Sequence, residues 1–575
     1  MHKVLDASDM GVYALFPPQV SAWAHTKLGE FRSREYEAEH GILIKIVPVP
    51  DTPLTRSPTF ILPLSTTTPS FSINNTNKSY KHQYANIYFV RLRIIRAVVE
   101  ENARKRWKEI AGDPVFVPRV LEVLKGQLCY IIGTVYMDMP LKPNVLDDIA
   151  RDHSIPGPPP RQKYCSPEDS TMLEDESGRI RLVGECLQSA RLVTGVIMGA
   201  LGIETNNGDF EVVDICFAGM APQPNAALTN TKDEENMDID DAAGLSGSDE
   251  WIALVSGFDV GAPSPSDAQL QLLSEYLAGE AGGFEEQVHV SRISRLIIAG
   301  NSLAPIVADE EAEKKPVRPP FLSSSHAVFL TKNIHEPIQR RYGYDHTSFT
   351  PHPTRNLSSY LTDMARSLPV HLLAGPSDPS GTILPQQPLP RAMFGGTSSY
   401  SSFSTETNPT YIHIGASSSD AEASTGKASS SKTSSNTSNM PERMVLVHSG
   451  QPVDDMFRYL PSPPTTRLAI VESTLRWRHL APTAPDTLWC HPYFTMDPFV
   501  LQETPDIYVV GNQPEFKTKL VVEQPKGKEG QKRCRIVLVP GFRESGTLVL
   551  VNLRTLAVRT VSFAVEGMTG GEVEA

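Results

Sequence analysis

The chain has 575 residues, of which 40% are apolar, and this length allows roughly three folded units with real cores. Its 53 basic and 66 acidic residues give a net charge of −13, which excludes a surface that traps nucleic acid over its whole extent. The six cysteines form no C-x-x-C pair, the first thirty residues carry no secretory pattern, and no apolar run is long enough to cross a bilayer. We therefore expect a soluble protein of the cytoplasm or nucleus with no membrane partner.

Residues 1–78 contain short apolar pieces broken by prolines, and we expect a variable, largely disordered N-terminal segment there. A helical segment, residues 79–112, follows, because apolar residues recur at spacings of three and four from Tyr84 to Trp107. We expect the basic side chains on its other faces to be solvated, with a nuclear-import signal or a nucleic-acid contact as the alternative. These side chains are Arg91, Arg93, Arg96, Arg104, Lys105, Arg106 and Lys108.

Short strand-like runs predict a small antiparallel barrel with an insertion in residues 113–224. The expected strands are Gln127–Tyr136, Ile180–Val183, Leu192–Gly202 and Phe210–Phe217. The proline-rich piece between Pro140 and Glu176 is expected to be a large excursion from the barrel. Residues 225–250 hold many acidic and few large apolar side chains, which is typical of a linker.

A different pattern fills residues 251–566, where five apolar runs end abruptly in glycine and a small polar loop. The runs are Ile252–Gly257, Leu296–Asn301, Val370–Gly375, Met444–Gly450 and Ile507–Asn512. Strands that are buried on both faces have this composition, and ligands of open α/β sheets bind just beyond the carboxyl ends of the strands. We therefore expect the five loops to meet at one edge of the fold, which held an active site at least in an ancestral protein. Loop insertions are expected at 305–352 and 415–440, and a C-terminal tail at 567–575.

The order and spacing of these strand ends resemble the calcineurin-like metallophosphoesterases, whose active members hold two metal ions there. The corresponding loops of this chain carry Gly257 and Asp259, then Gly300-Asn301-Ser302-Leu303-Ala304, then Gly375-Pro376-Ser377-Asp378, then Ser449, and finally Gly511-Asn512-Gln513-Pro514. In the fourth loop we align Ser449 with the family's single histidine, although His448 is one residue away. Amide, Gly, Ser and Pro residues cannot replace the ligands of a two-metal centre. The resemblance therefore implies no catalytic residue, no metal ligand and no cofactor.

A degenerate phosphoesterase that follows a small barrel resembles the B subunits of replicative DNA polymerases. Several segments are similar, more specifically, to the small, second subunits of DNA polymerase delta: Gln83–Tyr88, Pro159–Tyr164, Leu173–Glu176, Leu192–Gly195, Leu384–Leu389 and His479–Leu488. The resemblance implies an α+β multidomain fold. In it an OB-fold β-barrel precedes an inactive calcineurin-like phosphoesterase β-sandwich with flanking helices.

This resemblance implies a non-catalytic scaffold of the nuclear replication and repair machinery rather than an enzyme. Its expected partners are the cysteine-rich C-terminal domain of the catalytic polymerase chain and the third, clamp-binding subunit. DNA and the sliding clamp are reached only indirectly, through the holoenzyme. Two alternatives stay open, a metal-dependent phosphodiesterase and a single-stranded DNA-binding OB protein. The missing metal ligands argue against the first, and the few aromatic rings of the barrel argue against the second.

Overall fold

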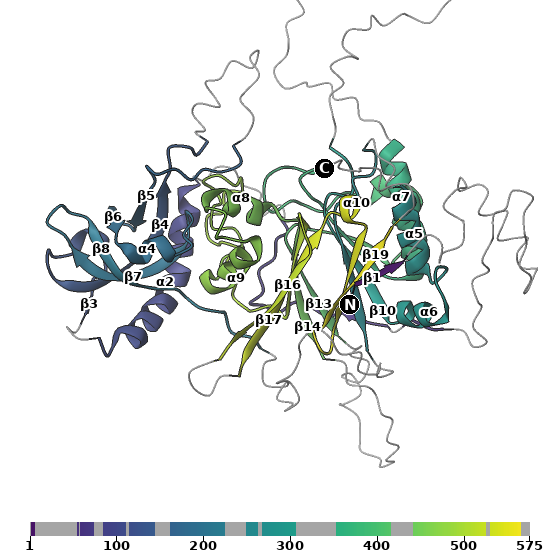
Figure 1. The fold of residues 1–575 in the computed structure, drawn as a ribbon, viewed down its shortest axis with the longest axis horizontal. Coiled ribbons are helices and arrows are strands. Elements are labelled where there is room, and N and C mark those ends of the chain that lie inside the picture. The colour runs from purple at the N-terminus through teal and green to yellow at the C-terminus, as the bar shows by residue number, and fades with distance from the viewer. Residues whose placement is uncertain are drawn as a thin grey trace, which may run out of the picture.

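The computed structural model describes residues 2–5, 54–56, 58–73, 84–110, 114–143, 161–224, 249–262, 267–305, 352–415, 441–524 and 530–564. They form an α+β, multidomain chain with three sheets (Figure 1). A barrel at the left of Figure 1 lies beside a pair of stacked sheets. Most of the expected linker 225–250 and of the insertions 305–352 and 415–440 lies outside the described residues, as does the whole tail 567–575.

The barrel is a six-stranded sheet of order β3-β4-β5-β6-β8-β7. An additional pairing of β4 with β7 closes the sheet into a barrel. Its strands are β3 (Val115–Phe116), β4 (Leu128–Asp138), β5 (Ser170–Glu174), β6 (Arg179–Val183), β7 (Ile197–Glu204) and β8 (Phe210–Cys216). Two short helical elements accompany them, η2 (Val120–Glu122) and α4 (Glu185–Ser189). The predicted barrel is therefore present, although β7 begins five residues later than we expected.

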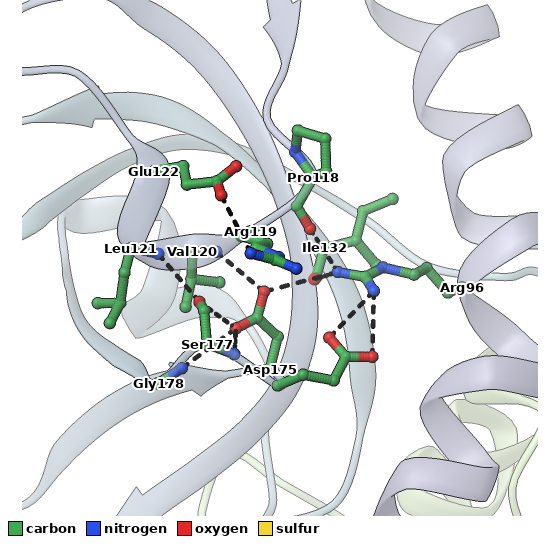
Figure 2. Close-up of polar contacts among 11 residues, drawn as sticks. Arg96, Pro118, Arg119, Val120, Leu121, Glu122, Ile132, Asp175, Ser177 and Gly178 are labelled. Atoms are coloured by element: carbon green, nitrogen blue, oxygen red, sulfur yellow. Dashed lines mark hydrogen bonds and ion pairs between the residues drawn. The ribbon is translucent and has the colours of Figure 1, made fainter.

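The expected excursion between Pro140 and Glu176 is wrong at its C-terminal end, because β5 pairs antiparallel with both β4 and β6. Residues 144–160 of this piece lie outside the described residues. The turn that follows β5 is held by the buried carboxylate of Asp175. This carboxylate accepts hydrogen bonds from the backbone N–H groups of Val120 at 2.9 Å and Ser177 at 2.8 Å (Figure 2). A strand of five residues has little pattern of its own, so its neighbours in the barrel determine its conformation.

Helix α2 (Ala85–Trp107) packs against β4, β7 and β8 of the barrel. The predicted apolar stripe is confirmed from Leu92 to Trp107, where its side chains are buried. Arg96 fastens the helix to the barrel, since it donates to the Pro118 carbonyl at 2.7 Å (Figure 2). Our expectation for the basic faces is wrong for Arg91, which is 0% exposed.

The second part of the chain contains two sheets that share an apolar layer. The seven-stranded sheet has the order β1-β19-β18-β9-β10-β11-β12 and the six-stranded sheet the order β16-β17-β15-β14-β13-β2. The strands of the first are β1 (His2–Leu5), β9 (Trp251–Val255), β10 (Ile293–Ala299), β11 (Val370–Leu373), β12 (Phe403–Glu406), β18 (Thr547–Asn552) and β19 (Val558–Phe563). Those of the second are β2 (Phe60–Ile61), β13 (Thr410–Gly415), β14 (Arg443–His448), β15 (Ile507–Gln513), β16 (Lys517–Glu523) and β17 (Lys532–Pro540).

Helices cover the outer faces of both sheets. Helices α5 (Asp267–Ala278), α6 (Phe284–Ser291) and α7 (His352–Ser367) contribute to the core on the outer face of the seven-stranded sheet. Helices α8 (Gln451–Tyr459) and α9 (Arg467–Trp477) lie between the six-stranded sheet and the barrel (Figure 1). One apolar cluster runs from barrel residues such as Ile131 to α9 residues such as Leu475, so a continuous core joins the two parts. The remaining helical elements are η5 (Arg391–Ser399) and α10 (Phe542–Ser545). None of the described helices is long and apolar enough to span a membrane.

Residues 54–56 and 58–73, which we call the strap, correct the expectation for residues 1–78. Strand β2 of the strap pairs antiparallel with β13. Phe71 is buried, and its ring stacks on that of Tyr411 with 5.5 Å between the ring centroids. Short apolar pieces between prolines cannot form a long element of their own, but they can add to the edge of an existing sheet. The prediction of a largely disordered segment is therefore wrong for the strap.

Candidate functional site

The five predicted strand ends meet at one place, although they belong to two sheets. Strands β9, β10 and β11 run parallel in one sheet, and β14 and β15 run parallel in the other. Within the first sheet, the Gly257 N–H donates to the Gly300 carbonyl at 2.9 Å. The Asn512 side chain joins the sheets, because its Nδ2 donates to the carbonyls of Ala299 at 3.2 Å and Ser449 at 2.8 Å. The predicted common edge is therefore present, and we call it the strand-end site.

The glycines at the strand ends allow the loops to approach closely. Gly300 has a φ of +86°, and a Cβ atom there would lie 2.5 Å from the Cβ of Ser449 and 2.9 Å from the Cα of Gly375. A side chain at this position would be strained and would also collide with both neighbours. Gly300 thus keeps three loops in contact.

An amide network centred on Asn408 fills the strand-end site. The two hydrogens of Asn408 Nδ2 are shared among three acceptors, Ser449 Oγ at 2.6 Å, Gln386 Oε1 at 2.7 Å and Gln451 Oε1 at 3.0 Å. The Asn408 Oδ1 accepts a 3.0 Å hydrogen bond from the Ser449 N–H. Amides can donate and accept at once, so they satisfy one another here without a charge. Asn408 was not predicted from the sequence, because it follows β12, a short strand that does not end in glycine.

Two acidic residues remain among the predicted loops. The buried carboxylate of Asp378 accepts hydrogen bonds from the N–H groups of Leu303 and Gly375, each at 2.8 Å. Burial raises the pKa of Asp378 to about 6, although the hydrogen bonds from the backbone oppose this rise. Burial also raises the pKa of Asp259 above its ordinary value. Asp378 therefore holds two loop backbones together through the oxygens that a metal ion would need.

The fourth loop contains both Ser449 and His448, and they lie on opposite sides of the chain. Ser449 belongs to the amide network, whereas the Nε2 atom of His448 lies 3.2 Å from the hydroxyl of Tyr508. Neighbouring residues of a strand face opposite ways, so only one of the two can reach the strand-end site. His448 is fully buried, and desolvation lowers its pKa to about 3.

The strand-end site offers mainly amides, hydroxyls and backbone groups. Within the described ranges, no three His, Cys, Asp or Glu side chains lie close enough together to hold a metal ion. Amide and hydroxyl groups are weak ligands for the transition metals of hydrolases. The side chains of the network can hold loops in place, but they provide neither an imidazole nor a pair of free carboxylates for hydrolysis.

A second polar cluster, which the sequence analysis missed, joins α2 to the loops that follow α9. The Arg91 guanidinium donates to Asp497 Oδ2 at 2.8 Å and to the carbonyls of Pro482 and Ala484 at 2.7 and 2.8 Å. The Nε2 atom of His479 lies 2.8 Å from the same Asp497 oxygen. We call this cluster the Arg91 junction.

The sequence does contain a signal for the burial of Arg91. Arg91 lies four residues from both Ile87 and Ile95, which are buried on the same face of α2. The barrel closes the Arg91 junction from the other side, where a Cβ atom on Gly195 would lie 1.9 Å from the Pro482 carbonyl oxygen. Glycine at this position therefore allows the barrel and the second part to touch.

Family models match both parts of the chain. A model described as the DNA polymerase delta subunit OB-fold domain matches residues 83–215, which include α2 and the barrel. A model for the B subunits of DNA polymerases alpha and epsilon matches residues 252–518. The barrel therefore has the OB fold.

Curated relatives match over most of their length. The DNA polymerase delta small subunit of Arabidopsis thaliana is 34% identical over 484 residues, which cover 84% of this chain and 92% of the relative. The DNA polymerase delta small subunit of Saccharomyces cerevisiae is 32% identical over 512 residues, with 85% and 91% covered. DNA polymerase delta subunit 2 of Drosophila melanogaster is 32% identical over 492 residues, with 85% and 94% covered. The chain therefore belongs to the family of DNA polymerase delta small subunits.

Proposed function

We propose that the chain is the non-catalytic scaffold subunit of a nuclear DNA polymerase delta, active in DNA replication and repair. It binds the cysteine-rich C-terminal domain of the catalytic chain and the third, clamp-binding subunit, and it reaches DNA and the sliding clamp through the holoenzyme. Membership of the small-subunit family supports this assignment. The continuous core between the barrel and the sheets also supports it, because a scaffold must hold its partners at a fixed distance.

The second part of the chain is, in this proposal, a calcineurin-like phosphoesterase sandwich without catalytic, metal-binding or cofactor-binding residues. The observation that carries this proposal is the amide network, in which Asn408, Gln386 and Gln451 bond to one another and to Ser449. Carboxylates and imidazoles would be needed at such strand ends to bind two metal ions. The network instead fastens the loops that follow β11, β12 and β14 to one another.

The domain limits follow from the same assignment. Residues 79–112 form a helical segment, 113–224 the OB-fold domain and 251–566 the phosphoesterase-like domain, with residues 225–250 as the linker between the two. The two family matches, at residues 83–215 and 252–518, support a division between these domains.

Co-expression of the tagged full chain with the polymerase delta catalytic chain and the third subunit of the same organism tests the proposal. We expect both partners to co-purify with the tagged chain. Deletion of the cysteine-rich C-terminal domain should remove the catalytic chain and leave the third subunit in the complex. Retention of the truncated catalytic chain would contradict the proposed contact, and recovery of neither full-length partner would contradict the scaffold function itself.

A further inference from the structure

The strap is held at several points along its length. Its Arg56 guanidinium donates to the carbonyls of Leu277, Val290 and Ile293 at 2.7 to 2.8 Å. Its Leu62 N–H donates to the His413 carbonyl of β13 at 2.8 Å. Between these contacts and the buried Phe71 lies a mostly exposed stretch, residues 63–70.

Three hydroxyl groups of this exposed stretch surround one carboxylate. Ser65 Oγ donates to Glu503 Oε1 at 3.2 Å, and Thr68 Oγ1 donates to Glu503 Oε2 at 3.3 Å. Thr67 Oγ1 donates to Glu503 Oε1 as well. Among the described residues, these hydroxyls donate to Glu503 or to one another, and none forms a hydrogen bond with a Lys or Arg side chain. Glu503 thus holds the middle of the strap.

Glu503 belongs to a loop that joins the barrel, α2 and the sheets. Val500 of this loop packs in one apolar cluster with Leu92 of α2. Thr504 donates from its N–H to the Pro222 carbonyl at 2.9 Å and from its Oγ1 to the Ala221 carbonyl at 2.7 Å, at the point where the chain leaves the barrel. Glu503 therefore lies next to Thr504 and three residues after Val500, which contact the end of the barrel and α2.

Thr68 is followed by Pro69, and a hydroxyl residue before proline is the minimal target of proline-directed protein kinases. The kinase would transfer the γ-phosphoryl group of ATP to Thr68. A bond forms between Oγ1 and the γ-phosphorus, the bond from that phosphorus to the β,γ-bridging oxygen breaks, ADP leaves, and the hydroxyl proton passes to the kinase base or to water. The product carries a charge of about −1.5 to −2 at neutral pH. This charge would lie beside the Glu503 carboxylate, where the Thr68 hydroxyl donates now.

We propose that Thr68 is a phosphorylation site of a proline-directed kinase, and that phosphate at Thr68 detaches the strap from Glu503. The Thr68 N–H donates to the Ser65 carbonyl in a turn, whereas kinases bind extended peptides, so local opening precedes the reaction. Phosphate then holds the strap open, because closure would place two negative groups in contact. The inference concerns a modification of the strap and does not depend on the proposed partners.

The test uses the purified full chain, a cyclin-dependent kinase and Mg-ATP. Mass spectrometry of the product should find phosphate at Thr68 in the wild type and in Glu503→Gln, and should find none at this position in Thr68→Val. Pro69→Ala should lose most of the reaction because it removes the kinase motif. Deuterium exchange at the Leu62 amide and its neighbours should become roughly tenfold faster, or more, after phosphorylation of the wild type.

Glu503→Gln is the matched control, because it keeps a hydrogen-bond acceptor and removes the repelling charge. Phosphorylated Glu503→Gln should show a much smaller increase in exchange than the phosphorylated wild type. The modification site is overturned if the kinase phosphorylates a peptide of residues 60–73 but leaves Thr68 of the full chain unmodified. Phosphorylation that leaves strap exchange unchanged, or that accelerates it equally in Glu503→Gln, would overturn the proposed detachment.

Discussion

The guanidinium of Arg91 donates a 2.8 Å hydrogen bond to the carboxylate of Asp497, and both side chains are completely buried although 406 residues separate them in the sequence. Burial by itself raises the pKa of Asp497, but the interactions with His479 and Arg91 outweigh it and hold this pKa well below its usual range. The carboxylate therefore remains charged inside the protein. A polar contact and not only apolar packing thus fastens α2 to the second part of the chain.

Replacement of Arg91 by alanine should lower the free energy of unfolding by about 3–5 kcal/mol, because it leaves the Asp497 charge buried without a cation. Urea unfolding of the full chain, followed by tryptophan fluorescence, measures this loss. Arg93→Ala is the matched control, since Arg93 is exposed on the same helix and should change stability little. Equal stability of the two variants would mean that the Arg91 junction contributes nothing.

Replacement of both Leu92 and Ile95 by aspartate should weaken the attachment of the barrel to the second part. These side chains pack with Ile132 of the barrel and with Val500, and each buried carboxylate costs several kcal/mol. Thermal unfolding should occur at a lower temperature, and less of the partner chains should co-purify. The double variant Arg104→Glu/Lys105→Glu should change neither, because these exposed side chains form ion pairs with Glu100 and Glu101 of the same helix, one turn away. Unchanged assembly of the aspartate variant would remove α2 from the core of the scaffold.

Purified protein should not hydrolyse phosphodiesters above background when manganese or zinc is supplied. The physical reason is that the amide network occupies the strand-end site and that both Asp378 oxygens already accept backbone hydrogen bonds. A chromogenic phosphodiester assay measures this, with Asp259→Asn and Asp378→Asn as comparison variants. Metal-dependent turnover that either substitution abolishes would contradict the prediction.

Acid should destabilise the protein through His448, whose pKa falls from its ordinary 6.5 to about 3 on burial. Below pH 6.5 this histidine binds a proton in the unfolded chain but not in the folded chain. The free energy of unfolding therefore falls by about 1.4 kcal/mol per pH unit down to pH 3. Between pH 7 and pH 5, His448→Gln should therefore lose about 2 kcal/mol less stability than the wild type. Denaturant unfolding at both pH values measures the difference, and His352→Gln, at an exposed site, should behave as the wild type does. Parallel pH profiles for wild type and His448→Gln would show that His448 titrates normally.

Replacement of residues 416–440 by a short Gly/Ser link should leave folding and assembly intact. The ends of this segment lie close together, because Ile414 pairs with Arg443 in the antiparallel strands β13 and β14. Shortening a loop changes its closure entropy by only about 0.6 kcal/mol per halving. Solubility, thermal unfolding and co-purification of the partner chains measure the outcome. Insoluble protein would mean that the serine-rich segment packs against the rest of the chain.

Part of the fold could be predicted because its signals are local. The stripe from Leu92 to Trp107 repeats with the period of a helix, and each of the five strands of the strand-end site carries its own apolar run and its own glycine. The ends of parallel strands meet at one edge of each sheet, which brings the loops of one sheet together, whereas the stacking of the two sheets brings the two sets of loops together. The gap in the prediction is Asn408, which has neither an apolar run nor a glycine to mark it.

The sequence alone was enough to predict α2, most strands of the barrel, the five strands of the strand-end site and the resemblance to one family, because each of these depends on residues that are neighbours in the chain. The tertiary structure alone decided that Arg91 is buried, that the strap packs, and that Asn408 joins Ser449 in the amide network. In each case the deciding partner is distant in sequence, such as Asp497 for Arg91 or Tyr411 for Phe71. The desolvation of a polar group and the pairing of an edge strand depend on what the fold places next to them, and no local pattern specifies that neighbour.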